Sequence, residues 1–207
     1  IKEQLGNHEQ VIFAGFTHEI AIELIEKLLK VLPKADLFAN SKNPRALTKA
    51  FFSDNGSTSV EVAIKMALQF FYNKGCHDKK RVITFTDAYH GDTVGTMSIG
   101  AADTFHHAFK SILFPVDRVD APDKFLVNAQ TKPISSEERL KAEEESLKAL
   151  VKQIEKKPDQ HAALIIEPLV QAAGGMKFHS TAYLQKIREI CNHVDIFLIA
   201  DEVFTGF

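Results

Sequence analysis

Tryptophan is absent from this sequence of 207 residues, and only two cysteines, Cys76 and Cys191, are present. The cysteines lie far apart and form no CxxC pair, so we expect no disulfide scaffold and favour a reducing compartment. No run approaches the roughly 18 apolar residues that a membrane-spanning helix requires. The opening segment IKEQLGNHEQ lacks the charged and then apolar pattern of a secretory signal. These absences favour a cytoplasmic protein.

An excess of charge of one sign is also missing. The sequence has 25 Lys and Arg against 27 Asp and Glu, for a formal net charge of -2. We therefore expect neither a nucleic acid nor an anionic membrane as a partner. The sequence contains no HExxH motif or Cys/His cluster, no GxSxG motif and no GK[ST] phosphate loop. A metal site, a serine nucleophile and a Walker A site are thus not expected.

Helical and extended patterns alternate along the chain. Apolar spacing predicts three amphipathic helices, at residues 18–32, 57–72 and 183–194. A further exposed helix is predicted to begin at Ser135 or Ser136, with acidic residues in its first turn. Apolar and β-branched runs predict strands at residues 48–53, 81–86, 162–168 and 195–203. Because several of these runs are continuously apolar, we predict an α/β fold with a mostly parallel sheet covered on both faces.

Polar segments follow each predicted strand. They are DNGST, DAYHG, EPLVQ and DEV, in chain order. In open parallel sheets, ligands bind at the carboxyl ends of the strands. The sequence therefore predicts a ligand site built from these segments.

Two of these segments have both a binding and a structural interpretation. Residues 54–58 combine a glycine turn with a helix start, which suits an anion, but an ordinary helix cap has the same pattern. Tyr89, before His90 and Gly91, has a ring that could stack on a flat ligand or simply pack on the core.

Two carboxylates end predicted buried strands, Glu167 and Asp201. A buried carboxylate is unfavourable by several kcal/mol unless a positive or hydrogen-bonding group meets it. For Asp201, a protonated heterocycle nitrogen is a natural partner. A metal ion or an internal salt bridge would also serve, and the spacing alone does not distinguish these.

Taken together, the motifs resemble the class III (ornithine-type) aminotransferases, which use pyridoxal 5'-phosphate (PLP). The carriers are FFSDNGSTSVEVAIKMA, FTDAYHGDTVGTMSIG, LIIEPLVQAAGGM and LIADEVFTGF, in the order the family has them. The resemblance runs from about Gly15 to Phe207 and implies fold type I of the PLP-dependent transferases. Residues 1–40 would form an N-terminal segment and helix, and residues 41–207 would form part of the PLP-binding large domain.

The resemblance also implies roles for individual residues. Gly56 and Ser57 would bind the cofactor phosphate, and Tyr89 would lie against the pyridine ring near the substrate. Asp201 would be the catalytic residue within this sequence and would pair with the pyridine nitrogen, and Val203 would pack on the other ring face. Glu167 would support this network, Gln171 would approach the ring edge, and Asp92 would lie near the substrate.

Within the class, QAAGGM and neighbouring segments are most similar to the branch that makes 7,8-diaminononanoate for biotin. The expected reaction moves an amino group from S-adenosylmethionine, or from lysine in some members, to 8-amino-7-oxononanoate. The intact protein is expected to be a homodimer. Alternatives are an ornithine, 4-aminobutyrate or other ω-amino transaminase, or a non-catalytic PLP-fold or nucleotide-binding module.

The lysine that binds the cofactor covalently in this class lies beyond the DEV motif. We expect it after Phe207, so the 207 residues alone should not turn over. Lys65, Lys79 and Lys80 are interpreted as surface charges, and His106, His107 and His161 as surface or loop residues.

Overall fold

The structure is a computed structural model that describes residues 1–7, 11–32, 47–100, 106–126 and 134–206. The chain divides into an N-terminal unit, Ile1–Phe52, and a C-terminal unit, Ser53–Phe207. The N-terminal unit holds helices α1 (Lys2–Asn7) and α2 (Glu19–Val31). His18 caps α2 by accepting the N–H of Ala21, at 3.3 Å. The domain boundary expected near residue 40 lies outside the described residues.

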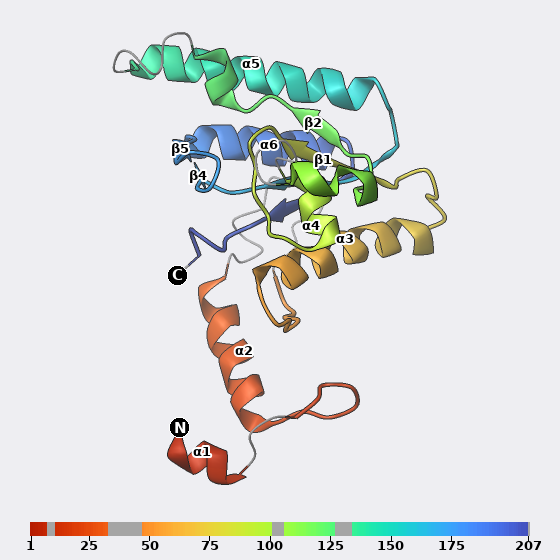
Figure 1. The fold of residues 1–207 in the computed structure, drawn as a ribbon, viewed down its shortest axis with the longest axis vertical. Coiled ribbons are helices and arrows are strands. Elements are labelled where there is room, and N and C mark those ends of the chain that lie inside the picture. The colour runs from red at the N-terminus through yellow and green to blue at the C-terminus, as the bar shows by residue number, and fades with distance from the viewer. Residues whose placement is uncertain (8–10, 33–46, 101–105, 127–133, 207) are drawn as a thin grey trace. The chain divides into compact units, whose positions relative to one another are not determined.

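A parallel four-stranded sheet forms the centre of the C-terminal unit (Figure 1). Its strands are β1 (Arg81–Phe85), β2 (Asp117–Val119), β3 (His161–Ile166) and β6 (Phe197–Ala200), in the spatial order β2-β1-β3-β6. Every neighbouring pair is parallel. The predicted α/β fold with a parallel sheet is confirmed.

Helices cover both faces of this sheet (Figure 1). On one side lie α3 (Gly56–Asn73) and α4 (Val94–Ile99), and on the other lie α5 (Ser136–Glu155) and α6 (Thr181–His193). The described part of this unit also holds two 3-10 helices, η2 (His107–Ile112) and η3 (Pro122–Phe125), and a small antiparallel hairpin of β4 (Val170–Gln171) and β5 (Lys177–Phe178). No helix in the described ranges has the length and apolar character to cross a membrane.

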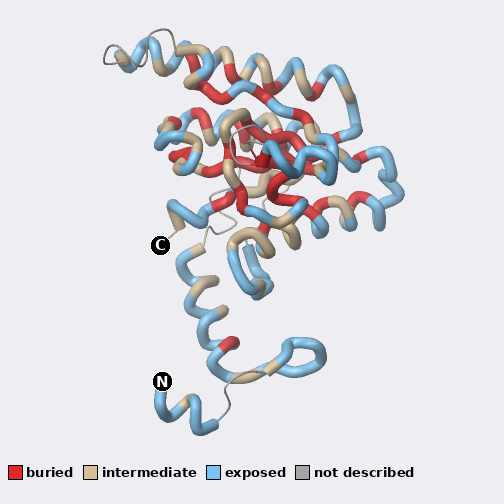
Figure 2. Tube along the Cα trace, viewed as in Figure 1, coloured by how far each residue is buried: buried red, intermediate tan, exposed pale blue. Residues whose placement is uncertain are grey.

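Alternating residues of the central strands divide the core into two layers. Ile83 and Leu164 pack with α5 and α6 on one face, whereas Val82 and Ile165 pack with α3 on the other. This alternation follows from the two-residue period of a strand, and it explains why these runs are apolar without interruption. Figure 2 shows the buried residues gathered along the strands and on the inner sides of the helices.

The predicted strand at residues 48–53 is wrong, because residues 47–53 have no regular secondary structure. A short apolar run does not by itself specify a strand, which also needs a neighbouring chain to satisfy its backbone. Phe51, at 64% exposure, lies on the surface of its unit. The predicted strand at residues 195–203 is shorter, Phe197–Ala200, and only partly buried, because β6 ends the strand order of the described sheet.

Candidate functional site

A cavity of about 340 Å³ lies in the C-terminal unit, beyond the carboxyl ends of β1, β3 and β6. The segments after these three strands and the start of α3 contribute its walls. The lining residues are Asn55, Gly56, Ser57, Tyr89, His90, Gly91, Glu167, Ala172, Ala173, Asp201, Val203 and Phe204. All four polar segments singled out in the sequence therefore reach one cavity.

The first wall is the N-terminus of α3. Asn55 caps this helix: its side chain accepts the N–H of Thr58 at 3.0 Å, and the Thr58 hydroxyl accepts the N–H of Asn55 at 3.1 Å. This reciprocal cap leaves the N–H groups of Gly56 and Ser57 without intrahelical acceptors, because the first turn of any helix lacks them. Both residues line the cavity, so their amide groups and the positive end of the helix dipole suit a phosphate bound there.

A glycine turn packs against this helix start. Gly91 has a φ of +119°, and a Cβ atom built on it would collide with the Ser57 hydroxyl. The adjacent N–H of Asp92 donates to the Ser57 Oγ at 3.3 Å. Since the hydroxyl oxygen is the acceptor in that bond, its own proton remains to donate to an anion.

Asp201 provides the acidic wall. It follows β6, is 8% exposed, and is fixed by its backbone N–H, which donates to the Ile166 carbonyl at 2.9 Å. One carboxylate oxygen lies 2.7 Å from His90 Nδ1, and the other accepts the N–H of Val203 at 3.2 Å. Because a carboxylate only accepts, His90 must donate from Nδ1, which fixes its tautomer if it is neutral.

His90 itself is a residue that the sequence reasoning gave no role. Its side chain is fully buried, and Nε2 has no hydrogen-bond partner among the described residues. A buried polar atom without a partner is uncommon in a protein and calls for an explanation, such as a bound ligand or water. The signal was the position of His90, directly between the Tyr89 and Gly91 that the sequence had already singled out.

Glu167 fastens two walls of the cavity together. Its two carboxylate oxygens accept the backbone N–H groups of Tyr89, at 3.0 Å, and Ala172, at 2.9 Å. Burial raises the pKa of Glu167 above its ordinary value, although both N–H groups favour the charged form. This carboxylate therefore joins the turn after β1 to the turn after β4.

Tyr89 and Asp92 form a polar edge beside the cavity. The Tyr89 hydroxyl donates to Asp92 at 3.0 Å, and Nε2 of His106 lies 3.1 Å from the other Asp92 oxygen. Hydrogen bonds from His106 and Tyr89 lower the pKa of the Asp92 carboxyl below its usual range. Asp92 does not line the cavity, but it is hydrogen-bonded to Tyr89, which does.

Gln171 does not line the cavity either. It is 1% exposed on β4, and its amide donates to the Thr86 carbonyl at 3.1 Å. His106 and His161 were expected to be surface or loop residues, and each is only 2% exposed. The expectation is wrong for His161, which begins β3, whereas His106 does lie in a loop but is buried there. Both bond an aspartate carboxylate, which allows an imidazole to be buried; His107 is exposed as expected.

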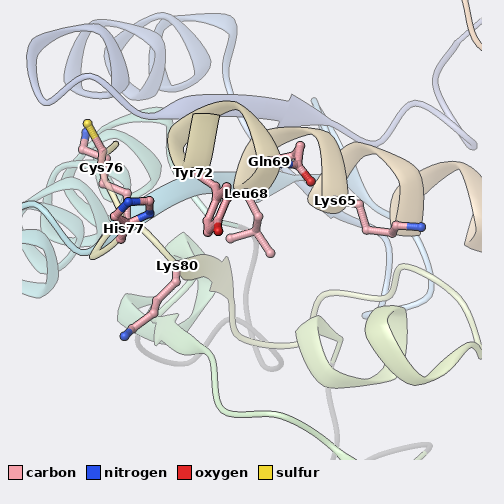
Figure 3. Close-up of a pocket in the computed structure, with 8 residues that line it drawn as sticks. Lys65, Leu68, Gln69, Tyr72, Cys76, His77 and Lys80 are labelled. Carbon is pink, nitrogen blue, oxygen red and sulfur yellow. The ribbon is translucent and has the colours of Figure 1, made fainter. Parts of the chain in front are cut away.

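A second cavity of about 340 Å³ lies along α3 and the turn after it (Figure 3). Tyr72 and Leu68 form part of its lining, and the amino groups of Lys65 and Lys80 point away from one another. Lys79 departs from its expected surface position. It is 9% exposed, because Nζ donates to the carbonyls of Val194 and Asp195 beyond α6.

The comparisons with known proteins agree on one family. The aminotransferase class-III family matches residues 1–207. An adenosylmethionine-8-amino-7-oxononanoate aminotransferase from Synechococcus elongatus is 42% identical over 207 residues, covering 100% of this chain and 44% of that protein. This chain thus spans less than half the length of the curated relatives it matches.

Solved structures show the same likeness. The enzyme of that name from Methanocaldococcus jannaschii has a TM-score of 0.81 at 30% identity, covering 100% of this chain and 40% of that one. An amine transaminase from an uncultivated Pseudomonas species, solved in its PLP-bound form, has a TM-score of 0.79 at 29% identity, covering 99% and 43%. This chain therefore belongs to the class-III aminotransferases, a family whose cofactor is pyridoxal phosphate.

Proposed function

We propose that the intact protein is the transaminase that moves an amino group to 8-amino-7-oxononanoate, giving the 7,8-diaminononanoate of biotin synthesis. The proposal is supported by curated relatives named for this activity, which match the whole of this chain at 39% and 42% identity. S-adenosylmethionine is the proposed donor, and lysine is the alternative. A cytoplasmic homodimer is the proposed working form.

The phosphate end of PLP fits the start of α3. The free N–H groups of Gly56 and Ser57 and the Ser57 hydroxyl would together hold it. The glycines leave the space that this requires: a Cβ on Gly56 would lie 2.8 Å from a methyl group of Val203, and one on Gly91 would collide with Ser57. A larger residue at either position would push side chains into the cavity.

The ring end of PLP fits Asp201. A pyridine nitrogen stays protonated beside a buried carboxylate, because the negative charge favours the charged form of the ring. His90 would then hold the Asp201 carboxylate in place through its Nδ1 proton, at 2.7 Å. Glu167 lies within the same wall, but both of its carboxylate oxygens accept backbone N–H groups, so we assign it a structural role in this wall.

The two faces of the ring are assigned to Tyr89 and Val203, both of which line the cavity. Tyr89 would stack on one face and present its hydroxyl, bonded to Asp92, toward the substrate. Val203, at 75% exposure, has an apolar surface to offer the other face. Gln171 is buried outside the cavity lining and is left without a direct role.

Bound PLP supplies an electron sink for the bonds to the α-carbon of an amino substrate. The residues described here would supply the binding and the charge. The start of α3 anchors the phosphate, Asp201 keeps the ring nitrogen protonated, and Tyr89 orients the substrate edge. The lysine that moves the proton in this class is expected after Phe207 and contributes nothing to the geometry described.

One observation carries the proposal: Gly56, Ser57 and Asp201 line the same cavity, so one small cofactor can touch them all. The test uses the full-length protein with added PLP. We expect an absorption band near the visible edge, which disappears when the downstream lysine is replaced. We also expect transamination of 8-amino-7-oxononanoate, with S-adenosylmethionine or lysine, to exceed transamination involving 4-aminobutyrate or ornithine.

Two results would count against this proposal. The absence of the absorption band, or its survival without the lysine, would favour a non-catalytic PLP-fold or nucleotide-binding module. Preference for 4-aminobutyrate or ornithine would keep the cofactor assignment and replace the substrate with that of another class-III transaminase.

A further inference from the structure

His106 is buried beside the proposed substrate edge, yet it does not line the cavity. Its side chain is 2% exposed, whereas that of its partner Asp92 is 73% exposed. The distance from His106 Nε2 to the Asp92 carboxylate is 3.1 Å. A carboxylate only accepts, so Nε2 must carry the proton in this bond.

The exposure of the two partners is informative. Exposed ion pairs are usually weak, because two long side chains must both be ordered. Here the imidazole is already held by the protein interior, since its side chain is only 2% exposed, and a Cβ added to Gly100 would lie 3.6 Å from the ring carbon Cε1. Only the short side chain of Asp92 remains to be ordered, so the buried ring can fix an exposed carboxylate at little entropic cost.

Asp92 passes this constraint to two residues of the cavity wall. Its second carboxylate oxygen accepts the Tyr89 hydroxyl at 3.0 Å, and its backbone N–H donates to Ser57 at 3.3 Å. The rings of Tyr89 and His106 also stack, with centroids 6.2 Å apart and planes inclined by 22°. His106 therefore contacts Tyr89 in two ways, through the Asp92 carboxylate and by direct stacking of the rings.

We propose that His106 is a positioning residue, which holds Asp92 so that the Tyr89 hydroxyl faces the substrate in one orientation. This inference rests on the proposed function, in which Tyr89 touches the ring and the substrate. The hydrogen bonds that lower the pKa of Asp92 keep this carboxylate charged and accepting at neutral pH, which agrees with the role. Without the imidazole, Asp92 can rotate into solvent and the hydroxyl loses its fixed acceptor.

The test replaces the imidazole in the full-length enzyme. His106→Phe keeps a ring of similar shape without the donor, and His106→Gln returns an N–H donor at a similar reach. We expect His106→Phe to raise the KM for the amino substrate about tenfold, the effect of losing one hydrogen bond that orients a substrate contact. His106→Gln should bring the KM most of the way back to the wild-type value. His107→Phe changes the exposed neighbour and is the matched control, with no expected change in KM.

A double-mutant cycle separates positioning from packing. If His106 acts through Asp92, then His106→Phe should add nothing to the effect of Asp92→Ala, which removes both acceptor oxygens. A purely structural role would persist in that background. A readout independent of turnover is proton NMR, in which we expect a downfield imidazole N–H signal that His106→Phe abolishes and Asp92→Ala shifts.

The outcomes are distinguishable from failure of the proposed function. A wild-type enzyme that forms no PLP band and transfers no amino group would overturn that function first. A functional wild type in which His106→Phe leaves KM unchanged, or in which the two substitutions add independently, would overturn the role of His106 alone. Thermal melting of each variant identifies any change in the kinetics that comes from unfolding.

Discussion

At the scale of single residues, the site depends on how Asp201 is held. The sequence identified this carboxylate by its position after an apolar run, and left a ring nitrogen, a metal and a salt bridge as possible partners. The structure adds His90, which donates to it from a fully buried ring. Sequence spacing could not reveal this bond, because the two residues are 111 positions apart and belong to different strand ends.

Replacement of Asp201 tests the charge in the site. Asp201→Asn keeps the size of the side chain and one acceptor oxygen, but it removes the negative charge that faces the ring nitrogen. We expect kcat/KM for transamination to fall at least about a hundredfold, the scale for removing one group that stabilises developing charge. Steady-state kinetics of the full-length enzyme would measure it.

The matched control is Glu202→Gln, which neutralises the exposed carboxylate next along the chain. It should leave both rate and thermal midpoint unchanged. Near-normal activity in Asp201→Asn, with a normal melting curve, would refute the role of Asp201.

Replacement of Gly91 tests the fit of the phosphate pocket. Gly91→Ala adds a methyl group that collides with Ser57 and places a non-glycine residue at a φ of +119°. Backbone strain of this kind costs about 1–3 kcal/mol, which corresponds to about a tenfold weakening or more if it displaces Ser57. Titration of the apoenzyme with PLP, followed by absorbance, should show the higher Kd.

Gly75→Ala separates strain from collision. Gly75 has a φ of +76°, but nothing lies within 4 Å of a Cβ built on it. This variant should share the loss of stability and keep the wild-type affinity for PLP. Equal effects of the two variants on affinity would show that the Ser57 contact is irrelevant.

At the scale of elements, periodicity predicted the long members well. The predicted helices correspond to α2, α3, α5 and α6, and three of the predicted strands correspond to β1, β3 and β6. The short strands were not predicted: β2 has three residues, and each strand of the β4–β5 hairpin has two. Segments this short have too few side chains to show a period, and their pairing is decided by neighbours that only the folded chain provides.

An ion network joins three strands at the edge of the sheet opposite the cavity. Asp117 begins β2 and accepts from Arg81 at 2.9 Å, from Lys157 at 2.6 Å and from His161 at 3.0 Å. Burial alone would raise the pKa of Asp117, but these three donors outweigh it and hold that pKa well below the usual range. Because the folded-state pKa is depressed, the charged carboxylate stabilises the fold above the unfolded pKa of about 4 and loses this effect as pH falls below it.

Asp117→Asn should therefore destabilise the protein at neutral pH by about 2–4 kcal/mol, since it leaves partly buried cations without their counter-charge. Below about pH 4 the difference from wild type should shrink, because wild-type Asp117 is then losing its own stabilising effect. Thermal midpoints followed by circular dichroism from neutral to acidic pH would measure this. A difference that is constant with pH would contradict the account.

The PLP affinity of this variant should stay near wild type, because Asp117 lies at the amino ends of the strands.

At the scale of the whole unit, parallel strand order explains why distant motifs meet. Strands β1, β3 and β6 run in the same direction and lie side by side, so the segments that follow them share one edge. The sequence could predict this edge because it requires only continuous apolar strands and polar segments after them. It could not predict which side chains turn toward the cavity, as Gln171 and Asp92 illustrate: both follow the pattern and neither lines the cavity.

The most direct measurement is a crystal structure of the full-length enzyme with PLP bound. The account predicts phosphate oxygens about 3 Å from the amide nitrogens of Gly56 and Ser57, and the ring nitrogen about 3 Å from an Asp201 carboxylate oxygen. A cofactor whose phosphate lies away from the start of α3, or whose ring nitrogen faces a group other than Asp201, would contradict it.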